Sequence, residues 1–226
     1  MITLRKIISD IRNIATSGSN PINFAMEDSQ IAFWINETRS MLISQSLQKR
    51  NDVNDSWLQQ ITCLDLVEAD KSECCEITTN CKILRTSLKI PDTIDTVADN
   101  FIVRVETNNG NIISKTTAFE SKYNNYSKFS SNKPKWYFKN DYLYIINEEF
   151  VDQINITAVF ESPEDLAAFT SCNGSTCFSY DDGYPVTMKM ASQITDIVLK
   201  TKVLVFYQMP KDTSNNSDTD SDRQTK

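Results

Sequence analysis

Hydrophobic residues recur every three to four positions at both ends of the chain and alternate with polar ones in the middle. Residues 2–16 carry one apolar stripe at helical spacing, and charged or polar residues cover the rest of the surface. The stripe consists of Leu4, Ile7, Ile8, Ile11, Ile14 and Ala15. This pattern predicts an amphipathic helix that ends at the glycine and proline of SGSNP.

Residues 28–49 predict a longer helix with apolar residues on two sides. One stripe is Ile31, Trp34, Ile35, Thr38, Met41 and Leu42. Phe33, Ile43 and Leu47 lie on the opposite side, with Glu37, Arg39, Ser44 and Ser46 between the two sets. A helix on the surface of a globular protein needs only one apolar face. The second face therefore requires a further neighbour.

A third helix, predicted over residues 186–209, repeats this feature. It begins after Pro185 and ends before Pro210. Its broad face is Val186, Met190, Ile194, Ile197, Leu204 and Val205, and the opposite side carries Met188, Leu199 and Phe206. Two explanations remain open for both helices: each is sandwiched between elements of one chain, or the second face contacts another molecule.

The middle of the chain has the two-residue period of β-strands. Five segments rich in β-branched and aromatic residues begin near Gln59, Cys81, Phe101, Lys135 and Gln153. Asn109–Gly110 and Asn140–Asp141 are hairpin turn signals. The segment SPEDLAAF predicts a short helix, with Ser162 as its N-cap and Pro163 in its first turn.

Together these elements predict an α+β fold with a central antiparallel β-barrel or sandwich. We expect residues 1–50 to form one helical domain with residues 162–209, and residues 57–160 to form the β-domain. Residues 210–226 lack apolar side chains and predict a polar tail that is disordered in the isolated chain.

Composition narrows the possible functions. The net charge is −7, and the lysines and arginines are scattered. Specific nucleic-acid binding is therefore not expected, whereas an acidic surface allows DNA to pass without sticking. No apolar run is long enough to span a membrane, and the N-terminal segment does not resemble a secretion signal.

The chain contains no histidine, which excludes serine–histidine and cysteine–histidine catalysis. With four glycines and no paired-ligand motif, the sequence predicts no cofactor, no metal site and no enzyme activity. A carboxylate-based hydrolase using Glu148–Glu149 is an unfavoured alternative, because adjacent side chains on a strand end point apart.

Two further features allow more than one interpretation. The aromatic residues Tyr123, Tyr126, Phe129, Trp136, Tyr137 and Phe138 are typical of a barrel core, with a carbohydrate-binding surface as the alternative. The six cysteines, Cys63, Cys74, Cys75, Cys81, Cys172 and Cys177, do not have zinc-ribbon spacing. We expect reduced thiols, with a metal site or a Cys172–Cys177 disulfide as alternatives.

Several segments resemble a known family in the same order along nearly the whole chain. They are IAFWINETRSMLISQ, CLDLVEADKSECC with CKILRTSLKIP, KPKWYFKNDYLYI, SPEDL and YPVTMKMASQITDIVLK. The chain is similar to the structural ring proteins, or head-to-tail connectors, of crAss-like tailed phages. None of these segments is a catalytic signature.

The resemblance implies a virion protein made in the cytoplasm of the host bacterium. It implies a homo-oligomeric ring, expected to be twelve-fold, that joins the portal protein to neighbouring tail rings and surrounds a DNA channel. A tail-tube or tail-hub ring is the alternative. The resulting hypothesis is that Phe33, Ile43, Leu47, Met188, Leu199 and Phe206 pack across subunit or ring boundaries.

Overall fold

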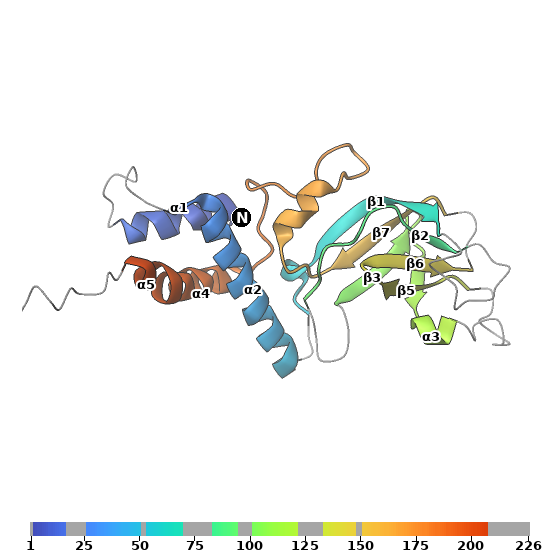
Figure 1. The fold of residues 1–226 in the computed structure, drawn as a ribbon, viewed down its shortest axis with the longest axis horizontal. Helices are drawn as coiled ribbons and strands as arrows, with labels where there is room; N and C mark the ends of the chain where they lie inside the picture. The colour runs from blue at the N-terminus through green and yellow to red at the C-terminus, as the bar shows by residue number, and fades with distance from the viewer. Residues whose placement is uncertain are drawn as a thin grey trace, which may run out of the picture.

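The computed structural model describes residues 2–16, 26–50, 53–69, 83–94, 101–121, 133–147 and 151–207. Helices from both ends of the chain gather at one end of the molecule, and a β-barrel forms the other end (Figure 1). The α+β class and the central barrel predicted from the sequence are confirmed.

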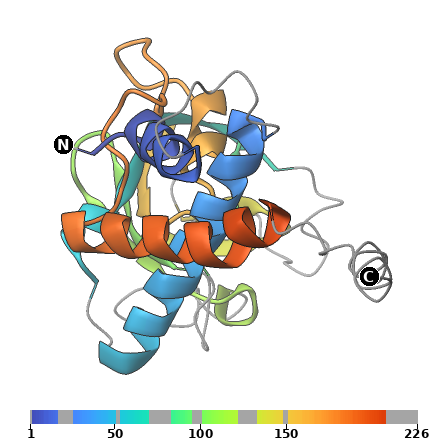
Figure 2. The same ribbon diagram turned by 90° about the vertical axis from the view of Figure 1, so that its left-hand side faces the viewer.

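The helical end consists of α1 (Leu4–Ala15), α2 (Asp28–Arg50), α4 (Met188–Val198), the π-helical turn η5 (Leu199–Val203) and α5 (Leu204–Tyr207). Helix α2 contacts both α1 and α4 on one side. Figure 2 shows α4 and α5 crossing in front of α2. Because the barrel lies beyond α2 in Figure 1, α2 is the middle layer of the molecule.

Seven strands form the barrel, preceded by the 3-10 turn η2 (Asp55–Trp57). They are β1 (Gln59–Glu68), β2 (Leu84–Thr86), β3 (Ile102–Thr107), β4 (Ile112–Lys115), β5 (Lys135–Lys139), β6 (Tyr142–Ile146) and β7 (Gln153–Ala158). The closed order is β1-β2-β6-β5-β4-β3-β7. Neighbouring strands are antiparallel except β4 and β5, which are parallel. The connection between those two includes α3 (Ala118–Ser121) instead of a hairpin turn, so β5 can run in the same direction as β4.

Local turn chemistry follows the sequence. Asn140 and Asp141, between β5 and β6, both have positive φ, and Gly110, between β3 and β4, has a φ of 80°. These values suit the tight hairpin turns that both dipeptides predicted. Bulges interrupt β1 between Ile61 and Leu64, and β3 between Ile102 and Arg104. Bulges bend strands, and that bending helps a sheet of seven strands to close.

The core is continuous from the helices into the barrel. Along β7, Ile154, Ile156 and Ala158 are fully buried and alternate with half-buried residues. The same buried cluster includes Ile31 and Ile35 of α2. Packing across the two ends therefore fixes the helices on the barrel.

The aromatic residues of β5 lie inside this packing. Trp136 is buried and Phe138 packs against the main core, while Tyr137 belongs to a smaller cluster in which its ring stacks on that of Tyr144. The ring centroids of the two tyrosines are 5.1 Å apart. Trp136 and Phe138 therefore pack as expected for a barrel core, whereas Tyr137 is buried in the separate cluster. Tyr123, Tyr126, Phe129 and the pair Glu148–Glu149 lie outside the described residues.

The short helix predicted at SPEDLAAF is present as the 3-10 helix η4 (Pro163–Ala168), with Ser162 at the N-cap position and Pro163 in the first turn, although Ser162 forms no side-chain capping bond. Another element prediction needs correction. The last helix is not uniform, because the π-helical turn Leu199–Val203 interrupts it. A π-helical turn contains more residues than an α-helical one, so every position after it rotates relative to a wheel of constant period. As a result Val203 is buried, whereas Leu204 and Val205 are exposed.

The prediction of reduced thiols was wrong for Cys63 and Cys172 and holds for Cys177. Cys63 and Cys172 form a disulfide, with their Cα atoms 5.2 Å apart, and Cys177 is free. The two partners are 109 residues apart in the sequence. Cys74, Cys75, Cys81 and the polar tail lie outside the described residues.

Candidate subunit interface at the helical end

A groove runs between α1 and α4 on the outside of the helical end. Its volume is about 450 Å³. Ile7, Ala191 and Leu199 provide buried apolar side chains along it. Its polar lining comes from Lys6, Asp10, Asn13, Ser192, Thr195 and Asp196. We call this the α1–α4 groove. An apolar groove with a polar rim suits an amphipathic protein partner.

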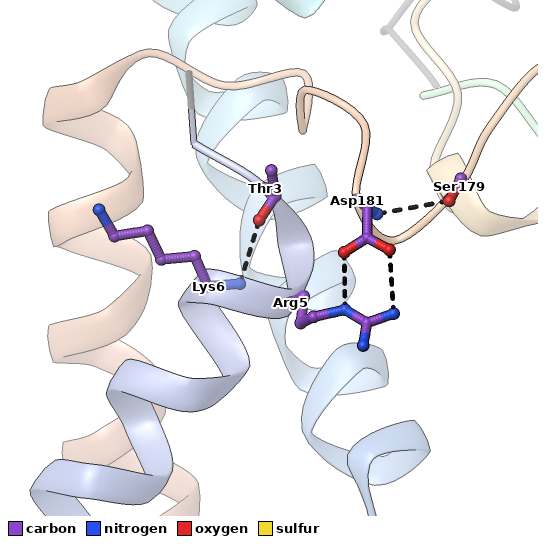
Figure 3. A network of polar contacts seen from close by, with 5 residues as sticks. All are labelled: Thr3, Arg5, Lys6, Ser179 and Asp181. Atoms are coloured by element: carbon purple, nitrogen blue, oxygen red, sulfur yellow. Dashed lines mark hydrogen bonds and ion pairs between the residues drawn. The ribbon is translucent and has the colours of Figure 1, made fainter.

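The start of α1 is fixed by several bonds. Thr3 caps the helix by accepting a bond from the Lys6 N–H, at 3.2 Å. Arg5 makes a two-pronged ion pair with Asp181, whose own N–H donates to the Ser179 hydroxyl (Figure 3). The Tyr184 N–H also donates to the Ile2 carbonyl at 2.8 Å. These contacts hold α1 beside the chain that leads into α4, which gives the groove a defined shape.

Exposed apolar side chains border the groove. Met188, in the first turn of α4, is 69% exposed, and Ile14, in the last turn of α1, is 57% exposed. Elsewhere on α2 and α5, Phe33, Met41, Leu204 and Val205 are also exposed. We refer to these six residues as the exposed helical set. Contiguous exposed apolar side chains are typical of protein-binding surfaces, whereas single ones occur on any protein surface.

The six residues predicted at subunit boundaries have different environments. Phe33 and Met188 are exposed, as contacts with another molecule require. Ile43, Leu47 and Leu199 are buried by the chain itself and leave little surface for a neighbour. The side chain of Phe206 lies outside the described part of the chain. The structure thus brings Met188 and Leu199 together along one groove and places Ile43 and Leu47 in the core.

The second face of α2 therefore has a neighbour within the chain. Arg39 lies between the two predicted stripes and is fully buried. Its guanidinium donates to the carbonyls of Phe160 at 2.7 Å, Pro185 at 3.1 Å and Trp57 at 3.4 Å. These carbonyls lie where the chain enters the barrel, leaves it and approaches α4. Arg39 thus joins the helical end to the barrel.

Burial lowers the pKa of Arg39 to about 10, so the side chain remains charged at neutral pH. No ion pair of this residue occurs among the described residues; the three carbonyl dipoles and the ring of Tyr184, 5.8 Å away, face the charge. A planar guanidinium can reach three acceptors at once. A lysine ammonium group cannot reproduce this arrangement of donors.

A chain of hydrogen bonds extends from this joint. The Tyr184 hydroxyl donates to Asn36 at 2.7 Å, and the Asn36 amide donates to Glu164 at 2.8 Å. Glu164 also accepts a bond from the Tyr180 hydroxyl at 2.7 Å. Burial, followed by the Glu164 contact, raises the pKa of Tyr180 to about 12. The network connects α2, η4 and the segment before α4.

Sequence reasoning placed Ile14, Met41, Leu204 and Val205 on the main apolar stripes of their helices, but all four are exposed. Leu204 and Val205 were misplaced because the π-helical turn has no simple sequence signal. Ile14 is on the correct stripe, but it lies in the last turn of α1, where it lines the α1–α4 groove and remains exposed. Helix length and neighbours, which the wheel does not contain, decide its exposure.

Searches for metal-binding clusters and for membrane-spanning helices cover the described residues. Within them, no three histidine, cysteine, aspartate or glutamate side chains are grouped closely enough to hold a metal ion. A search of the same residues finds no helix with the length and apolarity needed to cross a membrane. The exposed helical set and the α1–α4 groove are therefore the best candidate functional surface.

Comparison with known families agrees with a role in assembly. A family model described as "Phage tail ring protein 2" matches residues 6–222. The match includes the helical end and the barrel. No curated protein matches the chain.

Proposed function

Because the chain belongs to the tail ring protein family of crAss-like phages, and so is a structural component of the virion, we propose that its copies assemble into a closed ring through their helical ends. In a cyclic ring, two different surfaces of each subunit meet. The α1–α4 groove is one such surface, and exposed apolar side chains on the helices of the next copy provide the other. The exposure of Met188 at the edge of the groove is the observation that carries this proposal.

We further propose that the ring is twelve-fold and lies at the head–tail junction, where it joins the portal to the tail. The net charge of −7 supports a channel through which DNA passes without being held. A tail-tube or tail-hub ring further from the portal is the second candidate. The function requires no catalysis, and the absence of histidine from the sequence favours a purely structural protein.

Charged substitutions at the exposed positions test this proposal. Phe33→Asp and Met188→Asp together should leave the circular dichroism spectrum and the urea midpoint of the monomer unchanged, because neither side chain is in the core. The same double variant should fail to form rings and should be absent from virions. Electron microscopy and native mass spectrometry provide the readout.

Leu88→Asp is a matched control, since Leu88 is an exposed apolar residue outside the helices. This variant should assemble normally. Normal rings from the Phe33→Asp, Met188→Asp double variant would show that these helical surfaces are not the contact between copies.

A further inference from the structure

The Cys63–Cys172 disulfide connects the barrel to the segment that leads into α4. Cys63 is in the bulge of β1, and Cys172 is in the loop between η4 and α4. Cys172 is exposed and Cys63 is half-buried, so small thiols and disulfides in solution can reach the bond. The bond is thus both a tertiary link and an accessible redox centre.

The loop that carries Cys172 has hydrogen bonds of its own. The Cys177 N–H donates to the Phe169 carbonyl at 2.9 Å, and the Ser171 N–H donates to the Ser175 carbonyl at 2.7 Å. Between them, Thr170 and Thr176 form an antiparallel β-bridge. These bonds form a small hairpin with Cys172 near its turn. These bonds place Cys172 in a defined turn before the disulfide forms, and the disulfide adds to the stability of the hairpin.

Cys63 is also held in position by bonds that do not involve Cys172. Its φ is 53°, and its N–H donates to the side-chain oxygen of Asn155 at 2.9 Å. The Asn108 amide lies 3.6 Å from the Cys63 sulfur and donates to it. A donor at this distance stabilises a thiolate at Cys63, which is the form that takes part in disulfide exchange.

The hairpin continues into residues bound to the start of α1. Phe178 is buried, and the Tyr180 carbonyl accepts a bond from the Arg5 N–H at 3.3 Å. The Arg5–Asp181 ion pair follows directly (Figure 3). The disulfide therefore ties β1 to the helical end at a second place, in addition to the joint made by Arg39.

We propose that Cys63 and Cys172 are thiols while the virion assembles and form their disulfide in the released virion. We call this disulfide a redox clasp. Bacterial cytoplasm keeps accessible thiols reduced, so in the newly made chain the shared core and the Arg39 joint hold the two ends together without this covalent link. Oxidation outside the cell adds the second attachment and fixes the helical end against the barrel. The inference depends on membership of a phage family and not on which surfaces form the ring.

Closure needs an external oxidant, such as oxidised glutathione. The Cys172 thiolate attacks one sulfur of the oxidant and releases one glutathione thiolate. The Cys63 thiolate then attacks the Cys172 sulfur of this mixed disulfide and releases the second. Two protein thiols lose two electrons and two protons, and one glutathione disulfide becomes two glutathione thiols.

Hydrogen exchange of the full chain tests the mechanical part of the proposal. Cys74, Cys75 and Cys81 are first changed to serine, so that only the three described cysteines remain. A phosphine reductant should increase exchange in residues 169–184 by about tenfold or more, while the middle of α2 stays unchanged. Cys172→Ser should exchange rapidly with or without reductant. Cys177→Ser should keep the response, and equal exchange in the oxidised and reduced parent chain would overturn the clasp.

Thiol trapping tests the timing. Infected cells are quenched in acid and alkylated, and purified virions are treated in the same way before peptide mass spectrometry. The account predicts alkylated Cys63 and Cys172 in cells and a linked Cys63–Cys172 peptide in virions. A linked peptide already present in cells, or two alkylated thiols in virions, would contradict a clasp that closes on release.

Discussion

At the scale of single residues, Arg39 is the position on which the arrangement of the molecule most depends. A fully buried charge is costly unless hydrogen bonds and dipoles compensate it. Here three carbonyls from three chain segments do so. Sequence alone suggested a polar residue between two apolar stripes. It gave no sign that Arg39 joins the helical end to the barrel, because the three carbonyls are brought together only by the fold.

Replacing Arg39 by methionine should lower the free energy of unfolding by about 3 kcal/mol or more, since three buried carbonyls lose their donor. Arg39→Lys should recover only part of this loss. Arg5→Met is the control, because the Arg5–Asp181 ion pair is largely exposed and should contribute less than about 1 kcal/mol. Urea unfolding measures all three. Equal effects of Arg39→Met and Arg5→Met would contradict the proposed joint.

Tyr180 makes the stability of the folded protein depend on pH in the alkaline range. Its folded pKa is about 12, above the ordinary value of 10, because burial and the Glu164 contact disfavour the phenolate. The resulting stabilisation is fully present below pH 10 and is lost as the pH rises from 10 to 12. Urea unfolding at pH 9 and 11 should therefore show a smaller loss for Tyr180→Phe than for the parent chain. An identical loss in both would mean that Tyr180 does not contribute.

At the scale of elements, periodicity predicted the first helix, the long second helix and both hairpin turns, because each depends on local chemistry. It did not identify what covers the second face of α2. A helical wheel records that a face is apolar, but it does not distinguish a neighbour in the same chain from one in another molecule. The structure divides that face: Phe33 remains exposed, whereas Ile43 and Leu47 pack in the core.

This division can be measured in the monomer. Ile43→Ala should lower the free energy of unfolding by about 2–5 kcal/mol, as expected for a cavity in a packed core. Phe33→Ala should change it by less than about 0.5 kcal/mol, as is usual for surface positions. The two residues lie on the same helix and belong to the same predicted stripe. If both substitutions had the same effect on urea unfolding, α2 would not be packed as described.

At the scale of the whole molecule, the fold combines a barrel with helices that come from both ends of the chain. The α+β class and the barrel could be predicted because hydrophobic residues have helical spacing at both ends of the chain and a two-residue period in the middle. The parallel β4–β5 pair and the Cys63–Cys172 bond could not, because each joins segments whose pairing has no local signal. The candidate interface was predicted only in part: Phe33 and Met188 remain proposed contacts, and the α1–α4 groove emerged from the packing of two distant helices.

The disulfide should contribute measurably to the stability of the whole molecule. For a loop of about 100 residues, the chain-entropy model gives about 4.7 kcal/mol. Reduction of the variant that lacks Cys74, Cys75 and Cys81 should lower its free energy of unfolding by up to this amount. Cys177→Ser should behave like its parent in both states. An equal free energy of unfolding with and without reductant would show that the bond does not stabilise the fold.

The most direct test of the central claim is the copy number and symmetry of this chain in purified virions, measured by cryo-electron microscopy of the tail. The account predicts one closed ring of twelve identical copies, in which the α1–α4 groove, Phe33 and Met188 are covered by neighbouring protein. A chain present in only a few copies, or a ring in which these surfaces face solvent, would contradict it.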